Sequence, residues 1–122
     1  MKNEITIYHN PRCSKSRNAV CFLDEMELPY AIENVHVVEY LKNTLNKSEL
    51  SDLLKKIGIK AEELVRKGEP DYKENYKGKT LSESDWINAM VKYPKLIERP
   101  IVVFRDKAVV ARPKETINKL FI

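Results

Sequence analysis

Cys13 is the residue of this sequence best suited to covalent chemistry, because it lies in the polar turn "HNPRCSKSR" between an apolar segment and an amphipathic one. A thiol attacks electrophiles only as the thiolate, and a helix N-terminus or nearby cations lower its pKa. The spacing predicts a helix start here, and three cations lie within four residues: Arg12, Lys15 and Arg17. A buried cysteine that only fills space is the alternative, but the polar neighbours favour a reactive thiol.

The helix expected after Cys13 would supply an anion site. The backbone amides of Ser14, Lys15 and Ser16 would have no partner within the helix and would point outward. A thiolate beside them could attack the central atom of an oxyanion. Ser16 stands where dithiol redox proteins have their second cysteine, so a resolving thiol must come from another molecule.

Three arginines are candidates for holding that oxyanion: Arg66 in "ELVRKG", Arg99 in "IERPIVV" and Arg112 in "VVARPKE". A guanidinium binds tetrahedral oxyanions through two parallel hydrogen bonds. Sequence spacing leaves open whether the three converge, and an ordinary surface charge is the alternative for each.

The N-terminal part of the chain predicts a βαβ unit. Glu4–His9 alternates apolar and polar residues, as a strand does. Residues from Ser14 to about Glu27 have helical apolar spacing, and a second strand is expected over Tyr30–Val38. Because a helix separates the two strands, we expect them to be parallel.

The middle of the chain is expected to be helical. The predicted segments are a helix capped by Asn46 or Ser48 and ended by Gly58, a short helix whose last turn contains Arg66, a turn-rich segment over Pro70–Lys79, and a helix capped by Ser82 or Ser84 that stops at Pro94.

The C-terminal part predicts a hairpin of Ile101–Phe104 and Ala108–Ala111, followed by a helix over Pro113–Leu120. The fold class is therefore α/β: a thioredoxin-like mixed four-stranded sheet flanked by helices, with a helical insertion between the βαβ and ββα halves. In such folds a cis proline precedes the hairpin, which would be Pro100.

Composition limits the other possibilities. A length of 122 residues suits a single domain over residues 1–122. The net charge of +4 is dispersed along the chain, which argues against nucleic-acid binding, and no apolar run is long enough for a membrane span or signal peptide. We expect a cytoplasmic protein with two free thiols, no metal and no bound cofactor; Cys21 is expected to be a core or half-buried filler.

With these residues identified, the sequence resembles the glutaredoxin-coupled arsenate reductase family over nearly its whole length. The matching segments are "IYHNPRCSKSRN", "LLKKIGI" with "ELVRKGEP", "AMVKYPKLIERPIVV" and "ARPKE". The "CSKSR" form of the loop is typical of a chromosomal subgroup of that family.

The resemblance implies a mechanism. Cys13 matches the nucleophile, Arg66, Arg99 and Arg112 match the oxyanion-binding arginines, and His9 is implied to support the thiolate. Cys13 would attack arsenate to form a covalent adduct, and glutathione as co-substrate, with glutaredoxin as partner, would complete the reduction to arsenite.

Two other functions remain open. The first is a related glutathione-linked thiol oxidoreductase acting on another oxyanion or on a mixed disulfide. The second is a Spx-type regulator that binds RNA polymerase, although such regulators use a Cys-x-x-Cys switch and Ser16 occupies the second position. Within the site, Ser16 and Arg17 are expected to have supporting roles.

Overall fold

The computed structural model describes residues 4–25, 34–112 and 114–121. The chain separates into two compact units. The first contains residues 1–43 and 99–122, and the second contains residues 44–98. The prediction of one domain over 1–122 stays a prediction, and each unit is described by itself.

The first unit is built on a mixed four-stranded sheet with the strand order β2-β1-β3-β4. Its strands are β1 (Glu4–His9), β2 (Asn34–Glu39), β3 (Ile101–Phe104) and β4 (Lys107–Val110). β1 and β2 are parallel, and β3 runs antiparallel to both β1 and β4. The predicted α/β fold with a mixed four-stranded sheet is therefore confirmed.

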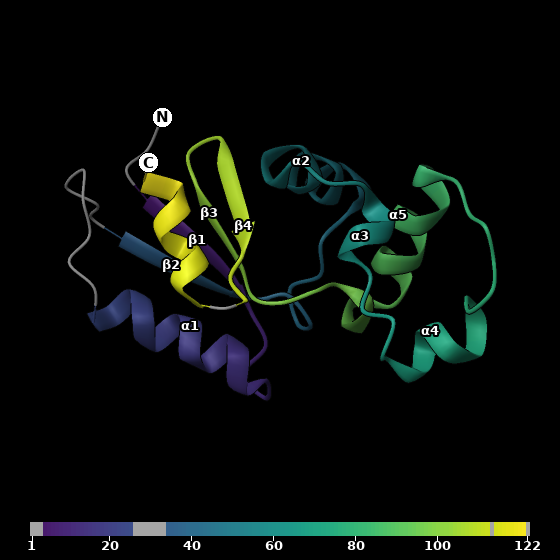
Figure 1. Ribbon diagram of the computed structural model, residues 1–122, viewed down its shortest axis with the longest axis horizontal. Helices are drawn as coiled ribbons and strands as arrows, with labels where there is room; N and C mark the ends of the chain where they lie inside the picture. The colour runs from purple at the N-terminus through teal and green to yellow at the C-terminus, as the bar shows by residue number, and fades with distance from the viewer. Residues whose placement is uncertain (1–3, 26–33, 113, 122) are drawn as a thin grey trace. The chain divides into compact units, whose positions relative to one another are not determined.

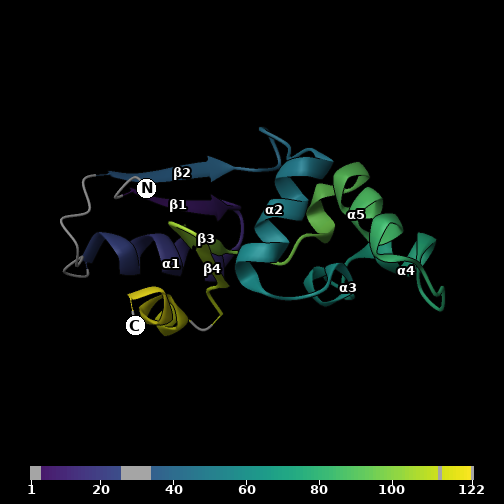
Figure 2. The same ribbon diagram turned by 90° about the horizontal axis from the view of Figure 1, so that it is seen from above.

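Two helical segments cover one face of this sheet. They are α1 (Ser14–Glu25) and the C-terminal 3₁₀ helix η2 (Lys114–Phe121), which lie on the same side of the strands (Figures 1 and 2). The alternation of β1 explains why: Ile5 and Ile7 are fully buried, while the alternate residues Glu4, Thr6 and Tyr8 are half-buried. The shared core is formed by Ile5, Ile7, Ala19, Leu23, Val102, Phe104, Ala111, Ile117 and Leu120.

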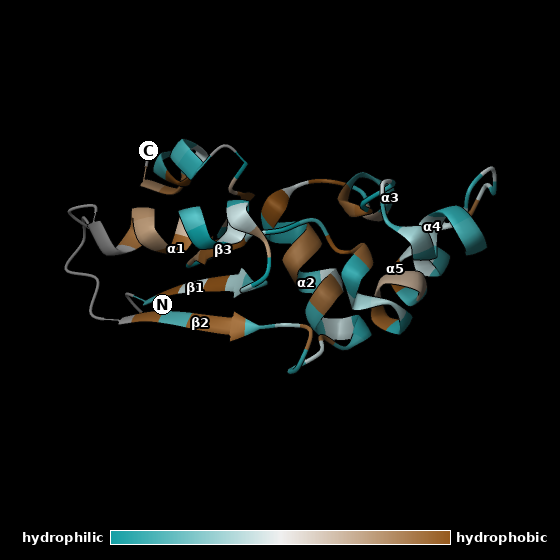
Figure 3. Ribbon diagram, turned by 90° about the horizontal axis from the view of Figure 1, so that it is seen from below, coloured by the Kyte–Doolittle hydropathy of each residue, from teal (hydrophilic) through white to brown (hydrophobic). Residues whose placement is uncertain are grey.

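The second unit is helical. It contains α2 (Lys47–Ile57), α3 (Ala61–Leu64), α4 (Pro70–Asn75), α5 (Glu83–Lys92) and the short 3₁₀ helix η1 (Pro94–Leu96). Hydrophobic residues are prominent on α2 and α5, whereas α4 is mainly hydrophilic (Figure 3). Asn46 caps α2, Ser82 caps α5, and Gly58 ends α2 with a φ of 83° in the left-handed region that favours glycine.

Some predicted boundaries are wrong. The helix expected to contain Arg66 in its last turn ends at Leu64, because Val65 pairs with Ile97 in an antiparallel bridge. The segment Pro70–Lys79, predicted to be turns, begins with α4.

The outer elements differ from the prediction in smaller ways. The fourth strand is shifted by one residue, to Lys107–Val110, and the C-terminal helix is of the 3₁₀ type. The expected residues 26–27 of the first helix, 30–33 of the second strand and Pro113 lie outside the described residues.

Candidate active site

The turn that carries Cys13 connects the end of β1 to the start of α1. Asn10 organises it: the Cys13 amide donates to the Asn10 carbonyl oxygen at 3.0 Å, and the Arg12 amide donates to Asn10 Oδ1 at 3.0 Å. Pro11 occupies the second position of this turn, where its fixed φ is favourable. Arg17 Nη1 donates to the Pro11 carbonyl oxygen at 2.9 Å, which ties the turn to the first turn of α1.

A buried polar cluster lies beneath the turn. Ser16 is fully buried, and its Oγ accepts a hydrogen bond from the Asn10 amide at 2.9 Å. The same oxygen lies 2.7 Å from His9 Nδ1. Burial lowers the pKa of His9, Glu39 opposes this effect, and Arg17 adds to it. With the ring neutral and Nδ1 unprotonated, Nδ1 can accept a hydrogen bond from the Ser16 hydroxyl while Ser16 Oγ accepts one from the Asn10 amide.

Cys13 occupies the N-cap position of α1, because its carbonyl oxygen accepts the first helical hydrogen bond, from the Arg17 amide at 3.0 Å. Burial raises the pKa of the Cys13 thiol, but hydrogen bonds from the Ser16 amide, the Arg99 guanidinium and the Lys15 amide lower it, as does the charge of Arg99. The net result is a pKa below the ordinary value, so the thiolate is more readily formed than in an unperturbed cysteine.

Arg99 reaches Cys13 because of the sheet pairing. Tyr8 pairs with Ile101, so the end of β1 lies beside the start of β3, which directly follows the cis Arg99-Pro100 bond. Burial disfavours the charged guanidinium, but Tyr40 and Cys13 both stabilise it, and the pKa of Arg99 is raised overall. Arg99 therefore stays a cation beside the thiol.

Arg112 lies two residues beyond β4, at the end of the hairpin. Ile101 pairs with Val110, and the Ala111 amide donates to the Pro100 carbonyl oxygen at 2.9 Å. Beyond these pairs the Arg112 amide donates to the Val110 carbonyl oxygen at 2.9 Å, which turns the chain away from the strand, so the convergence of Arg112 with Arg99 stays a prediction. Arg112 is exposed at this end of the sheet.

Arg66 belongs to the second unit. Its amide donates to the Leu96 carbonyl oxygen at 2.7 Å. Its guanidinium forms ion pairs with Glu98 at 3.3 Å and Glu69 at 3.8 Å. The convergence of Arg66 with the other two arginines stays a prediction.

Cys21 was predicted wrongly. The buried residues of α1 include Ser16, Ala19 and Leu23, and Cys21 lies on another side of the helix, where its thiol is exposed. Both cysteines are free, as expected.

Sequence reasoning missed two contributors to the site. Asn10, which directs the turn, was noticed only as part of a motif, although asparagine followed by proline is a typical turn signal. Tyr40 is buried at the end of β2 and hydrogen-bonds to Arg99, and no local pattern identifies it.

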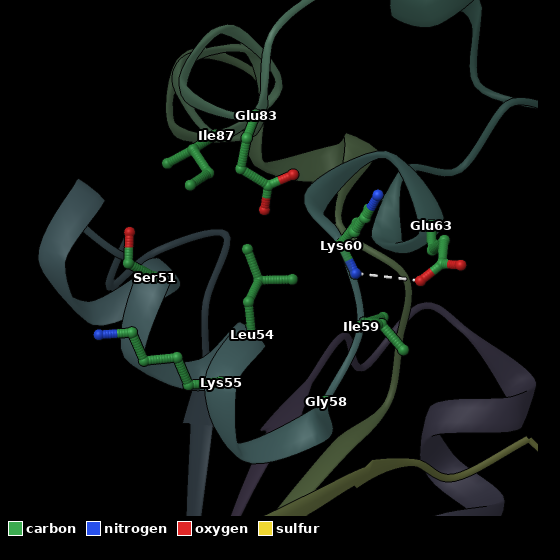
Figure 4. Close-up of a pocket in the computed structure, with 9 residues that line it drawn as sticks. All are labelled: Ser51, Leu54, Lys55, Gly58, Ile59, Lys60, Glu63, Glu83 and Ile87. Atoms are coloured by element: carbon green, nitrogen blue, oxygen red, sulfur yellow. Dashed lines mark hydrogen bonds between the residues drawn. The ribbon is translucent and has the colours of Figure 1, made fainter.

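A cavity within the second unit is lined by none of the predicted site residues. Its volume is about 690 Å³ (Figure 4). Its two carboxylates serve the start of α3: Glu83 accepts from the Ala61 amide at 3.0 and 3.1 Å, and Glu63 accepts from the Lys60 amide at 3.0 Å. The lining residues are Ser51, Leu54, Lys55, Gly58, Ile59, Lys60, Glu63, Glu83 and Ile87. None of these lining residues is a cysteine.

Within the described ranges, no three His, Cys, Asp or Glu side chains gather as metal ligands would. No helix in those ranges is long and apolar enough to cross a membrane.

Comparison with known proteins identifies the family. The sequence pattern of the ArsC family matches residues 8–120. The chain belongs to the ArsC family. This match contains the Cys13 turn, Arg66, Arg99 and Arg112.

Relatives of known sequence or structure agree with this assignment. An arsenate reductase of Neisseria meningitidis serogroup A is 40% identical, over 94% of this chain and 96% of that protein. The uncharacterized protein YfgD of Escherichia coli K12 is 45% identical, over 98% of both chains. The solved structure of an arsenate reductase from Vibrio cholerae superimposes with a TM-score of 0.86 and 35% identity, over 98% of this chain and 99% of that one.

Proposed function

We propose that this protein is an oxidoreductase that reduces arsenate to arsenite, with glutathione as co-substrate and glutaredoxin as partner, through a covalent adduct on Cys13. The observation that carries the proposal is the environment of the thiol. Cys13 receives hydrogen bonds from two backbone amides and from the Arg99 guanidinium, and its pKa is lowered. The family and the names of its relatives supply the substrate.

In the first step, the Cys13 thiolate attacks the arsenic atom of arsenate. A sulfur–arsenic bond forms, and one arsenic–oxygen bond breaks as the oxygen leaves in water. Arg99 is positioned to neutralise the oxyanion, since its raised pKa keeps it charged. Arg112 would supply the second cation for this task.

Arg66 is proposed as the third oxyanion ligand. Its two ion pairs engage Nε and Nη1, and a guanidinium has five N–H donors. The carboxylates of Glu69 and Glu98 would fix the orientation of the planar group. This role would make Arg66 a substrate-binding residue rather than a surface charge.

The electrons must come from outside the chain. Ser16 replaces a second cysteine in the turn, and Cys21 is eight residues further along, roughly 12 Å at ~1.5 Å per residue, well beyond the reach of a disulfide. Two molecules of thiol supply two electrons: arsenate and two glutathione thiols give arsenite, one disulfide and one water. Glutaredoxin would complete the transfer by thiol–disulfide exchange.

The test is arsenate-dependent NADPH oxidation in the presence of glutathione, glutaredoxin and glutathione reductase. Turnover should fall to background in Cys13→Ser and persist in Cys21→Ser, the matched control with an exposed thiol on the same helix. An inactive native protein whose Cys13 still alkylates rapidly at neutral pH would overturn arsenate as the substrate. It would favour a glutathione-linked reaction on another oxyanion or mixed disulfide.

A further inference from the structure

A small cavity of about 190 Å³ lies beside the Cys13 turn, within the first unit. Lys15 and Asn18 line it from α1, and Lys114 and Glu115 line it from η2, with Ala111 between them. The Lys15 backbone amide donates to the Cys13 thiol, so one wall of the cavity is continuous with the thiol's own hydrogen bonds. The cavity has no role in the binding of arsenate proposed above.

The polar side chains of this cavity are not paired with one another. Across residues 4–25, 34–112 and 114–121, the side chains of Lys15, Asn18 and Glu115 have no hydrogen bond or ion pair. The Lys114 ammonium lies 6.0 Å from the centre of the Phe22 ring, which holds it over an apolar surface. Two ammonium groups and one carboxylate are therefore presented to a ligand at the same time.

Opposite charges that share a cavity without pairing complement a zwitterion. An α-carboxylate would meet Lys15 and Lys114, an α-ammonium would meet Glu115, and the Asn18 amide could hydrogen-bond to either group. The volume is below the ~300–1,000 Å³ of pockets that enclose drug-sized ligands, and it suits one amino-acid end group.

We propose that this cavity binds the α-amino-carboxylate end of the reducing thiol, the γ-glutamyl end of glutathione. This inference rests on the proposed function, and it names Lys15, Lys114 and Glu115 as the residues that select the reductant.

The position of the cavity suits this task. The Ala111 amide donates to the Pro100 carbonyl oxygen at 2.9 Å. Arg99, which precedes Pro100 in the chain, hydrogen-bonds to Cys13. A ligand anchored between Lys15 and Ala111 would therefore lie next to residues that hydrogen-bond to the thiol or to the segment that carries Arg99. Anchoring its charged end raises the effective concentration of its thiol at the Cys13 adduct.

The experiment uses thiol–disulfide exchange, which needs no arsenate. In the Cys21→Ser background, Cys13 is converted to a mixed disulfide with thionitrobenzoate. An attacking thiolate forms a bond to Cys13 Sγ and releases the coloured thionitrobenzoate anion. Rates are compared for glutathione, for N-acetylglutathione, which lacks the ammonium charge, and for mercaptoethanol, which lacks both charged groups.

We expect glutathione to react roughly two- to fivefold faster than N-acetylglutathione, the gain of one partly exposed ion pair. Glu115→Gln should bring this ratio close to one. Lys114→Gln should slow both peptides by about the same factor and leave mercaptoethanol unchanged. Lys119→Gln, an exposed lysine of η2 outside the cavity, is the matched control and should change nothing.

If Glu115→Gln leaves the ratio of the glutathione and N-acetylglutathione rates unchanged, the zwitterion site is overturned. The proposed reduction of arsenate is not affected by that outcome. Equal slowing of all three thiols in Lys114→Gln would do the same, because it would indicate a general effect on Cys13. If the native protein does not reduce arsenate but still reacts faster with glutathione than with N-acetylglutathione, the proposed function alone is overturned.

Discussion

The first turns of α1 and α2 use the same backbone geometry for different purposes. In α2, Asn46 Oδ1 accepts from the Glu49 amide at 2.8 Å, and Glu49 Oε1 accepts in return from the Asn46 amide at 3.1 Å. In α1, Cys13 occupies the position of Asn46, and its sulfur accepts from the amide of Ser16, which occupies the position of Glu49.

The two helix starts differ in the role of the third residue after the N-cap, which is Glu49 in α2 and Ser16 in α1. Glu49 adds a negative charge to the start of α2, whereas the first turn of α1 has no acidic residue. Ser16 instead turns its hydroxyl toward Asn10 and His9. The helix start of α2 is thus satisfied by its own acid, while that of α1 keeps its positive potential for the Cys13 thiolate.

Among variants that keep Cys13, the largest expected effect comes from replacing the Arg99 guanidinium by an ammonium group. The substitution Arg99→Lys keeps the positive charge, but a lysine ammonium lacks the planar set of donors that lets Arg99 hydrogen-bond to the thiolate and to Tyr40 together. A lost hydrogen bond to a charged group costs roughly 1.5–3 kcal/mol, so kcat/KM for arsenate should fall about 10- to 150-fold.

The pH dependence of Cys13 alkylation is the second measurement on Arg99→Lys. The thiolate predominates above its pKa and is lost as the pH falls through it. Because Arg99 lowers the pKa of Cys13, its loss should move the profile to higher pH. An unchanged profile would remove Arg99 from the thiol's environment.

The next largest effect is expected for Ser16→Ala, on the free energy of unfolding. Ser16→Ala removes the partner of the buried Asn10 amide and of His9, and an unpaired buried polar group costs roughly 1–3 kcal/mol. We expect the free energy of unfolding in urea to fall by that amount. Ser14→Ala, at an exposed site two residues earlier, should change it by less than ~0.5 kcal/mol. Equal losses in the two variants would contradict this account of the cluster.

A smaller loss is expected at the other helix. Asn46→Ala removes the cap of α2 and should cost about 1 kcal/mol in the same unfolding measurement. The rate of Cys13 alkylation should not change, because the cap of α2 serves only its own helix. A slower thiol would indicate that the contrast between the two helix starts is incomplete.

Local patterns were sufficient for much of this architecture. The alternation of Glu4–His9 gave the boundaries of β1, and the caps Asn46, Gly58 and Ser82 were each among the residues named for their helices. Each of these features depends on residues adjacent in sequence, so the sequence alone carries the information.

Errors occurred where distant residues decide the structure. Val65 leaves the helical pattern because it pairs with Ile97. Helix α4 forms where Tyr72 stacks on Trp86, with the ring centres 6.3 Å apart. Residue type also misled: Cys21 is apolar, yet it lies off the buried stripe of α1. Reading that stripe from Ala19 and Leu23 back by one turn would have identified Ser16 as buried.

The candidate site likewise has features that the local sequence predicts and features that depend on residues far apart in the chain. A cysteine at a predicted helix start, among cations, is visible in the sequence. The contact between Arg99 and Cys13 depends on the pairing of Tyr8 with Ile101, almost a hundred residues apart in the chain, and no local spacing encodes it.

The smallest predicted effect makes α1 resemble α2. Ser14→Glu places an acid in the first turn of α1, at an exposed residue next to Cys13. The added charge interacts favourably with the helix start and should stabilise the fold by roughly 0.3–1 kcal/mol. The same charge opposes the thiolate, so the pKa of Cys13 should rise and alkylation at neutral pH should slow. Ser14→Gln is the matched control, and it should leave both quantities near the native values. Opposite changes in stability and reactivity from one substitution would indicate that the amides at this helix start serve the thiol rather than the fold.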